Sequence, residues 1–355
     1  MARFVFIGSY TSDDGQIENR PDGIYTCQVS DDGQLKLILS NLSGLNPSFL
    51  AQHPTRQFLY AVNELEANAA SAFAIAPQTG ALTLLNSQPT GGVWPCQASV
   101  DPTGRWLMVA NYKSGSLTVF PILPDGQLGP ASDYVEHQGV PGPDDRQEHA
   151  HAHMIKFDPT GRLVLVSDLG LDRMFIYHLD GNLGRLEASA QEMVVMPPAS
   201  GPRHFVFHPE GHLLYLANEL DSTVTACEWD SQSGTLGPFQ KLSTLPVGYE
   251  GYNDVADIHL HPSGRFLYVS NRGHDSLAVF SVDPNSGMLE AIGHTLSGGL
   301  TPRGFNVDPA GHFILVANQN SNNVVSLRVD PGSGLLYPTE YIISLPRPVF
   351  VLFYL

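Results

Sequence analysis

A short phrase recurs six times along this chain, and no other feature of the sequence constrains the fold as strongly. The copy at residues 261–272 predicts a tight turn around Pro262 and Gly264, followed by the β-favouring run 266–269. Successive copies start 48, 57, 50, 53 and 47 residues apart. A period of about 50 residues with several strands in each repeat is typical of a β-propeller. The six copies start at His53, Asp101, Asp158, His208, His261 and Asp308.

A second phrase, Gly-x-Leu, predicts the number of blades. Each copy follows a strand of alternating side chains, such as 117–120 or 277–280, and we expect it to form the turn into the outermost strand of a blade. It occurs once more often than the first phrase, so we predict seven blades. The glycines of the seven copies are Gly33, Gly80, Gly126, Gly181, Gly234, Gly287 and Gly334.

The mismatch between the two phrases predicts how the ring closes. The first blade lacks an opening strand, because residues 4–10, 23–29 and 35–39 supply only its second, third and fourth strands. The C-terminal run 349–352 would supply the missing one, which removes the exposed edges of an open sheet. We therefore predict an all-β, seven-bladed β-propeller of four-stranded antiparallel blades as a single domain over residues 1–355. The alternative is an open solenoid.

The composition argues against several function classes. A net charge of −17, spread along the chain, does not suit nucleic-acid binding, which needs a basic face. No apolar run approaches the length of a membrane span, and the strand-like start does not read as a secretory signal. We therefore expect a cytoplasmic protein. The three cysteines are too few and too far apart for a disulfide framework or a zinc site. They are Cys27, Cys96 and Cys227.

Alignment of the six copies places ionisable residues at two positions, five residues before and eleven residues after the start of each turn. Because the turn folds the innermost strand back onto the second strand, both positions should meet at one mouth of the central channel. The first position holds Ser48, Cys96, His153, Arg203, Ala256 and Arg303. The second position holds Glu64, Tyr112, Leu169, Glu219, Arg272 and Gln319.

These positions predict a candidate site on three consecutive blades, formed by His153, Arg203, Glu219 and Arg272. Guanidinium groups match carboxylate or phosphate, so the arginines indicate an anionic ligand. Histidine can act as a general base or acid near neutral pH, and arginine can stabilise an oxyanion. Glu219 would orient an arginine or the histidine. The alternative is a solvated ring of ion pairs. Further round the channel lie Arg303 and Glu64.

The sequence shows neither a Gly-x-Ser-x-Gly elbow nor a cysteine and a histidine that can be placed together. It therefore does not indicate a covalent acyl-enzyme.

The residue just before the second position is nearly constant, and we expect it to be structural. Asn and Asp side chains bond neighbouring backbone where a strand ends in a turn. The six residues are Asn63, Asn111, Asp168, Asn218, Asn271 and Asn318.

The run 148–153 contains three alternating histidines. On a strand, residues two apart face the same side, so His149, His151 and His153 would converge and could suggest a metal. No matching carboxylate or cysteine motif accompanies them, and we assign no metal here.

Two irregular stretches, 136–148 and 246–254, are either functional lids or simple insertions.

Taken together, the motifs resemble those of the seven-bladed propeller lactonases, over essentially the whole chain. Bacterial members of that family include 6-phosphogluconolactonases, and a fungal relative is the carboxy-muconate cyclase. The resemblance implies that His153, Arg203, Glu219 and Arg272 are the active-site residues. We add His151, Arg303, Glu64 and Tyr112 as substrate-binding candidates. The motifs are residues 8–11, 151–153, 157–159, 168–173, 202–204, 218–220 and 267–273.

The predicted function is hydrolysis of a sugar lactone, 6-phospho-D-glucono-1,5-lactone, to the open acid. This is the second step of the oxidative pentose phosphate pathway. The expected partner is this small anionic substrate, with no cofactor, no metal, no nucleic acid and no membrane; no oligomeric state is assigned. One alternative is a cycloisomerase acting on a muconate-type dicarboxylate, which would use the same side chains without water. The other is a non-enzymatic propeller that binds a protein partner.

Overall fold

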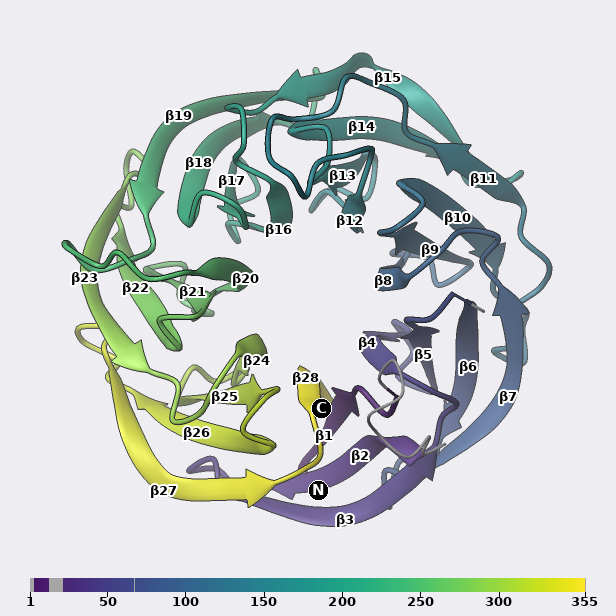
Figure 1. Ribbon diagram of the computed structural model, residues 1–355. Coiled ribbons are helices and arrows are strands. Elements are labelled where there is room, and N and C mark those ends of the chain that lie inside the picture. Colours follow the sequence, from purple (N-terminus) through teal and green to yellow (C-terminus); the bar gives the residue numbers. More distant parts are fainter. Residues whose placement is uncertain (1–2, 13–21, 67, 355) are drawn as a thin grey trace.

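The computed structural model describes residues 3–12, 22–66 and 68–354, and these form 28 strands and no helix. Seven sheets surround a central opening as the blades of a ring (Figure 1). The predicted seven-bladed propeller of four-stranded antiparallel blades is therefore confirmed. None of the described residues belongs to a helix that could cross a membrane. Met1, Ala2 and Leu355, the ends of the predicted domain, lie outside the described residues.

Six blades are built from four strands that follow one another from the channel outward in chain order (Figure 1). The first three of these comprise β4 (Pro47–Gln52), β5 (Phe58–Asn63), β6 (Ala69–Ile75) and β7 (Leu82–Pro89); β8 (Pro95–Val100), β9 (Trp106–Asn111), β10 (Ser116–Pro121) and β11 (Asp133–Glu136); and β12 (Ala152–Phe157), β13 (Val164–Asp168), β14 (Arg173–Asp180) and β15 (Arg185–Val195). The next three comprise β16 (Pro202–Phe207), β17 (Leu213–Asn218), β18 (Thr223–Asp230) and β19 (Thr235–Ser243); β20 (Asp254–Leu260), β21 (Phe266–Arg272), β22 (Ser276–Val282) and β23 (Leu289–Leu296); and β24 (Pro302–Val307), β25 (Phe313–Asn318), β26 (Asn323–Val329) and β27 (Leu336–Ser344).

The seventh blade joins the two ends of the chain. It consists of β28 (Pro348–Tyr354), β1 (Arg3–Ser9), β2 (Asp22–Val29) and β3 (Leu35–Leu42). The innermost strand, β28, pairs antiparallel with β1 from Phe4 opposite Tyr354 to Gly8 opposite Phe350. Figure 1 shows this pairing where the yellow and purple ends of the chain meet. The predicted closure of the ring is confirmed, and it leaves neither β1 nor β28 as an open edge.

Apolar cores lie between neighbouring blades, and β1 shows how one strand serves two of them. Val5 and Ile7 belong to a cluster shared with β25, whereas Phe4 and Phe6 belong to a cluster shared with β5. Side chains alternate between the two faces of a strand, so a strand buried on both faces reads as a continuous apolar run. This explains why the inner strands lack the polar alternation of a surface sheet.

The recurring turn lies at the end of the ring opposite the predicted site and links adjacent blades. A ring nitrogen of His53, Nε2, donates to the carbonyl oxygen of Gly104 in the next blade at 2.9 Å, and His261 does the same to Gly311 at 3.1 Å. Gly104 has a φ of 74°, and a Cβ there would lie 2.4 Å from His53 Nε2. Both the backbone conformation and the close approach therefore require glycine.

The Gly-x-Leu phrase marks the outer strand in most blades, but two copies need correction. In the fourth copy the residue with positive φ is Gly184, not Gly181, and Leu183 is 57% exposed. The phrase that enters β15 is therefore Gly184-Arg185-Leu186, three residues later, and its turn has the same length as the one that enters β19, since Asp180 pairs with Arg185 as Asp230 pairs with Thr235. In the third copy, Leu128 forms only an isolated bridge, and the outer strand begins later, at Asp133. The predicted number of blades is unaffected.

Candidate active site

A β-bulge at the beginning of each innermost strand positions the candidate site. In β4, for example, Pro47 lies opposite Asn63 and Phe49 opposite Val62, so Ser48 is the extra residue. The same interruption falls at the first aligned position in the other five copies. In two strands the bulge includes one more residue, which is His204 in β16 and Asp257 in β20. A bulge leaves its residue unpaired and re-aims the side chain, here toward the channel.

The two aligned positions meet at one mouth of the channel, as predicted. They share the wall of a cavity of about 220 Å³, far more than the ~15 Å³ that one water molecule requires. All of the ionisable residues predicted at these positions line it, together with four residues that the sequence did not single out for this site: Trp94, Cys96, Arg146 and Asp254. The predicted residues in its wall are Glu64, Tyr112, His153, Arg203, Glu219, Arg272 and Arg303.

Glu219 is the centre of an arginine cluster. It directly follows β17, and its carboxylate lies 2.7 Å from Arg203 Nε and 3.0 Å from an Nη of Arg272. Arg146 also contacts it. Although burial acts to raise the pKa of Glu219, Arg272, Arg203 and Arg146 together hold it well below its usual range. The side chain is 6% exposed, so Glu219 is a buried carboxylate that holds three guanidinium groups in place.

Two of these arginines also bond the bulged strand β20. Arg203 donates to the carbonyl oxygen of Ala256 at 2.5 Å, and Arg272 donates to that of Val255 at 3.1 Å. Burial, with Arg272 and Arg303 nearby, lowers the pKa of Arg203 to about 10, so it remains charged at neutral pH. The guanidinium groups are thus fixed in orientation before any ligand arrives.

A second group of charges lies across the cavity. Tyr10 donates to Glu64 at 2.9 Å, and Arg303 lies 3.7 Å from the same carboxylate and 5.3 Å from the centre of the Tyr10 ring. Although burial opposes the charged form of Arg303, Tyr10 and Glu64 raise its pKa. The ion pair of Arg303 with Glu64 is longer, at 3.7 Å, than the ion pair of Arg203 with Glu219, at 2.7 Å. More of the N–H groups of Arg303 are therefore available to a ligand.

His153 is buried between the two groups. Its ring contacts those of Tyr112 and His204 edge-on, with ring centroids 5.5 and 5.1 Å away. Burial first, and then Arg203, hold the pKa of His153 well below its usual value. The imidazole is therefore neutral at physiological pH and has a lone pair for a proton, as a general base requires.

The channel continues past His153 into the body of the ring. A narrow space of about 20 Å³ follows, lined in part by His204 and Asp257, and it leads to a wider cavity of about 300 Å³. His204 Nδ1 lies 2.9 Å from Asp257, whose other oxygen lies 3.1 Å from His259. Burial and Arg203 lower the pKa of His204 to about 4. His204, Asp257 and His259 therefore form a chain of polar contacts, and His204 packs against His153 on the side away from the mouth.

The structure corrects the statement that no cysteine and histidine come together. Cys96, at the first aligned position, lies with its Sγ 3.9 Å from His153 Nδ1. Burial raises the pKa of the Cys96 thiol, so the thiolate that a nucleophile needs is disfavoured. The pair thus gives no support to a covalent acyl-enzyme.

Arg146 and Asp254 come from the two irregular stretches and form an ion pair of 2.8 Å across the mouth. The side chain of Arg146 is 37% exposed, so this pair borders solvent. Their place in the cavity wall could not be predicted from the repeat, because neither stretch contains the recurring phrase. Each stretch contributes one residue to the cavity wall.

Tyr10 was also missed, although the repeat contains a signal for it. In the closing blade Pro348 lies opposite Ser9, just as Pro47 lies opposite Asn63 in the next blade. Tyr10 is therefore the seventh member of the second aligned position, and Val349 is the seventh member of the first. Extending the alignment to the chain ends would have found both.

The nearly constant residues before the second position are structural, and four of the six bond more distant partners than expected, whereas Asn111 and Asn218 bond the next strand of their own blade. Asn63, Asn271 and Asn318 donate to the carbonyls of Ser43, Thr244 and Ser297, in the connections that arrive from the preceding blade. Asp168 instead accepts hydrogen bonds from the backbone N–H groups of His151 and Leu171 and lies 2.7 Å from His137. These four side chains therefore fasten neighbouring blades near the mouth.

The histidine run does not converge as a strand would make it, because β12 begins only at Ala152. His153 faces the cavity, whereas His151 is absent from the cavity wall and stacks on Tyr112, with ring centroids 4.4 Å apart. The structure therefore does not bring His151 to a position of direct substrate contact.

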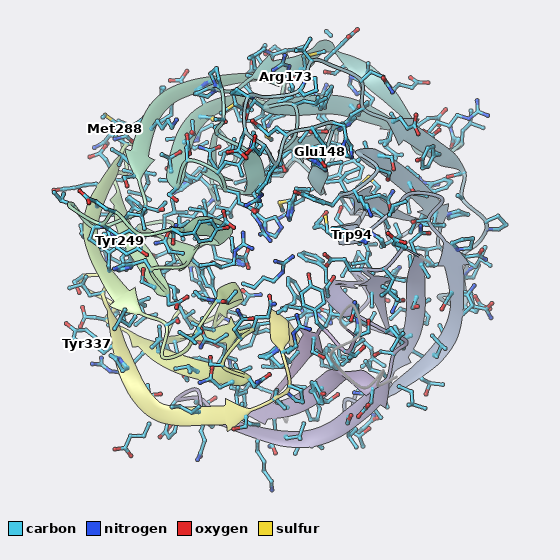
Figure 2. The ribbon with its side chains drawn as sticks, viewed as in Figure 1. Trp94, Glu148, Arg173, Tyr249, Met288 and Tyr337 are labelled. Atoms are coloured by element: carbon cyan, nitrogen blue, oxygen red, sulfur yellow. The ribbon has the colours of Figure 1, made fainter. Side chains whose placement is uncertain are left out.

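Figure 2 shows Trp94 and Glu148 near the inner edge of the ring, and Met288 and Tyr337 on its outer side.

The cavity is positive although the chain is strongly acidic. Its wall holds four arginines against three carboxylates, with His153 neutral, in a chain whose formal charge is −17. Such a local excess attracts an anion to this mouth. Fold and site together define a propeller with an arginine-rich cavity that contains one buried, neutral histidine.

Comparison with known proteins identifies the family. The model of the family "Lactonase, 7-bladed beta-propeller" matches residues 4–353, and this chain belongs to that family. A 6-phosphogluconolactonase of Bacillus subtilis is 34% identical over 313 residues, which cover 87% of this chain and 86% of the relative. A 6-phosphogluconolactonase of Formosa agariphila is also 34% identical over 313 residues, with 86% of each chain covered.

Solved structures give the same result. A putative 6-phosphogluconolactonase of Bacteroides fragilis superposes with a TM-score of 0.91 at 35% identity, covering 99% of this chain and 98% of its own. A periplasmic gluconolactonase of Pseudomonas aeruginosa superposes with a TM-score of 0.93 at 31% identity, covering 100% of this chain and 99% of its own. The predicted resemblance to propeller lactonases is confirmed.

The arginine cluster predicts a response to anions. Glu219→Gln keeps the size of the side chain but leaves three guanidinium groups without their shared counter-charge, which should lower the free energy of unfolding by about 3–5 kcal/mol. Inorganic phosphate should restore part of this loss and stabilise the variant more than the wild type, because the anion replaces the missing charge. Thermal unfolding with and without phosphate measures both effects.

The matched control is Glu66→Gln, which breaks the exposed ion pair between Glu66 and Lys113. It should leave the melting temperature and its response to phosphate unchanged. A Glu219→Gln protein as stable as the wild type, or one that phosphate does not stabilise preferentially, would contradict this view of the cluster.

Proposed function

We propose that this protein hydrolyses a sugar lactone, 6-phospho-D-glucono-1,5-lactone, to 6-phosphogluconate. The observation that carries the proposal is the union of four arginines and the neutral His153 in one cavity of a lactonase-family propeller. The names of the relatives support lactone hydrolysis, and the arginines favour a phosphorylated substrate. The periplasmic relative is named a gluconolactonase, so the phosphate preference rests on the arginines of this chain.

The arginines divide into two pairs by their position along the channel. Arg203 and Arg303 also line the narrow space that follows the cavity, and both belong to the charged surroundings of His153. We assign them to the lactone carbonyl, whose oxygen gains negative charge as water attacks. Arg146 and Arg272 line the cavity at the mouth but not this narrow space, and both lie beside Asp254, so we assign them to the phosphate. The substrate would thus enter with its reactive end toward His153.

The reaction then requires one water molecule. His153 takes a proton from this water as the water oxygen forms a bond to the carbonyl carbon, and Arg203 and Arg303 stabilise the oxyanion. When the tetrahedral intermediate collapses, the bond from that carbon to the ring oxygen breaks. The proton held by His153 passes to the ring oxygen, which becomes the hydroxyl group of the product. Glu219 keeps Arg203 in position.

Every step uses groups of the chain and water, so the proposal includes no cofactor. A phosphorylated sugar of central metabolism implies the cytoplasm, which remains a prediction. The existence of a periplasmic relative means that family membership alone does not decide the compartment.

His153→Ala should lower kcat/KM for freshly prepared 6-phosphogluconolactone by about 10²–10⁴-fold, because it removes the proposed general base. Formation of 6-phosphogluconate, corrected for spontaneous hydrolysis, gives the rate. His212→Ala alters an exposed histidine in the turn between β16 and β17 and should leave the rate unchanged. A His153→Ala protein that folds normally and keeps its activity would remove His153 from the mechanism.

The pH profile provides an independent test of His153. Because burial and Arg203 lower its pKa, the base stays neutral as the pH falls through 6.5, and kcat/KM at pH 5.5 should stay within about twofold of its value at pH 7.5. A histidine with an ordinary pKa of about 6.5 would retain about one tenth. Initial rates between pH 5 and 7.5 distinguish a general base with a lowered pKa from one with an ordinary pKa. A fall in kcat/KM centred near pH 6.5 would contradict the assignment of the buried His153 as the general base.

The same shift affects stability in a defined direction. Below about pH 6.5 the unfolded chain binds a proton at this histidine that the folded chain does not bind, so the free energy of unfolding falls as the pH drops. Melting temperatures recorded across the pH range therefore show whether any lost activity reflects unfolding.

A further inference from the structure

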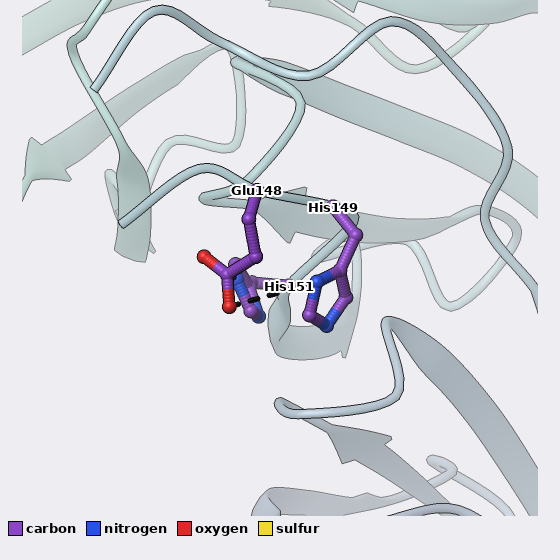
Figure 3. A group of neighbouring side chains, drawn as sticks. All are labelled: Glu148, His149 and His151. Atoms are coloured by element: carbon purple, nitrogen blue, oxygen red, sulfur yellow. Dashed lines mark ion pairs between the residues drawn. The ribbon is translucent and has the colours of Figure 1, made fainter. Parts of the chain in front are cut away.

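A second cluster of side chains lies beside the candidate active site and takes no part in the proposed reaction. Among the described residues, one group of three offers possible metal-ligand atoms that all lie within 4.8 Å of one another: Glu148, His149 and His151. One carboxylate oxygen of Glu148 lies 3.6 Å from His149 Nδ1, and the other lies 3.4 Å from His151 Nε2. Figure 3 shows the three side chains gathered on one side of the loop.

Both imidazoles are oriented as metal ligands usually are. His149 Nε2 lies 2.7 Å from the carbonyl oxygen of Lys113, and His151 Nδ1 lies 3.0 Å from that of Tyr112. A carbonyl only accepts, so each of these ring nitrogens carries the proton. The opposite nitrogens, His149 Nδ1 and His151 Nε2, therefore present lone pairs toward Glu148. A ligating histidine characteristically donates its other N–H to a backbone carbonyl or carboxylate.

His151 is also held rigidly and has an unsatisfied atom. Its backbone N–H donates to Asp168 at 2.8 Å, and its ring stacks on Tyr112 at an interplanar angle of 15°. The side chain is 3% exposed, and its Nε2 is buried without a hydrogen-bond partner. An unpartnered polar atom in such a position costs free energy unless something binds it. A cation bound by this lone pair would supply that partner.

We propose that Glu148, His149 and His151 form a binding site for a divalent transition-metal ion of the zinc class. Two imidazoles and one carboxylate are a donor set that zinc accepts. Ligands about 2.1 Å from a tetrahedral ion lie about 3.4 Å apart, close to two of the separations observed here. Three protein ligands leave the fourth position to water, and the exposure of Glu148 and His149 gives the ion a path from solvent.

This site has a defined relation to the active-site cavity. From the sequence, no metal was assigned because no carboxylate or cysteine motif accompanied the three histidines, whereas in the structure Glu148 lies beside His149 and His151 in place of His153. Glu148 and His149 belong to the loop that carries Arg146 to Glu219, and His151 stacks on Tyr112, which lines the cavity. An ion that joins these ligands would fasten the loop beside the cavity and so stabilise the position of Arg146.

The test is a zinc titration of the full chain without an affinity tag, after removal of metals with a chelator. Calorimetry should show one zinc ion per chain. Glu148→Gln, His149→Ala and His151→Ala should each weaken zinc binding by at least about tenfold. Cobalt(II) should give the intense visible absorption of a tetrahedral site in the wild type and lose it in the three variants.

The matched control is His212→Ala, which removes an exposed histidine that also lies beside a glutamate, Glu210, at 3.8 Å. It should leave zinc binding unchanged, and the melting temperatures of the metal-free variants show that each is folded. The proposal is overturned if the wild type binds no zinc stoichiometrically, or if the three folded variants bind it as tightly as the wild type. These readouts do not depend on lactonase activity.

Discussion

A β-bulge at the start of each innermost strand is the constraint on which the candidate site depends. The ladder between the first two strands of a blade is otherwise regular, and its side chains pack into the cores between blades. The bulge frees one residue per blade from this pattern and directs it toward the channel. His153, Arg203 and Arg303 all occupy bulged positions, whereas Glu219 and Arg272 lie at or just beyond the end of a second strand. The same strands can therefore keep an apolar core while their ends carry the chemistry.

The charges of the site are arranged to hold guanidinium groups ready for an anion. Glu219 contacts Arg146, Arg203 and Arg272, so these cations need no rearrangement when a substrate arrives. Buried charges are costly unless they are paired, and here a single carboxylate is shared by three cations. The resulting positive excess favours an anionic ligand. Burial first, and then the nearby Arg203, lower the pKa of His153, so the arginines that favour an anion also help to keep this histidine neutral.

The sequence predicted the ring, its closure and most of the cavity wall because each depends on a repeat. Once six copies are aligned, strand pairing alone brings Glu64 and Arg303 to the same mouth from different blades. Two of the residues that were missed, Arg146 and Asp254, come from irregular stretches without the repeat, whose path depends on ion pairs across the mouth. Tyr10 was missed because the alignment was not extended to the chain ends. The three histidines do not converge as alternation along a strand would place them, because β12 begins only at Ala152, and the coordinates place Glu148 beside His149 and His151 instead of His153.

The most direct test of the central claim is a crystal structure of the protein with 6-phosphogluconate bound. The account predicts that the product occupies the cavity at the bulged ends of the inner strands. Its carboxylate should lie beside His153, with its phosphate between Arg146 and Arg272. A product bound outside this cavity, or bound within it with no arginine contact to the phosphate, would contradict the proposed site even though the seven-bladed ring would stand.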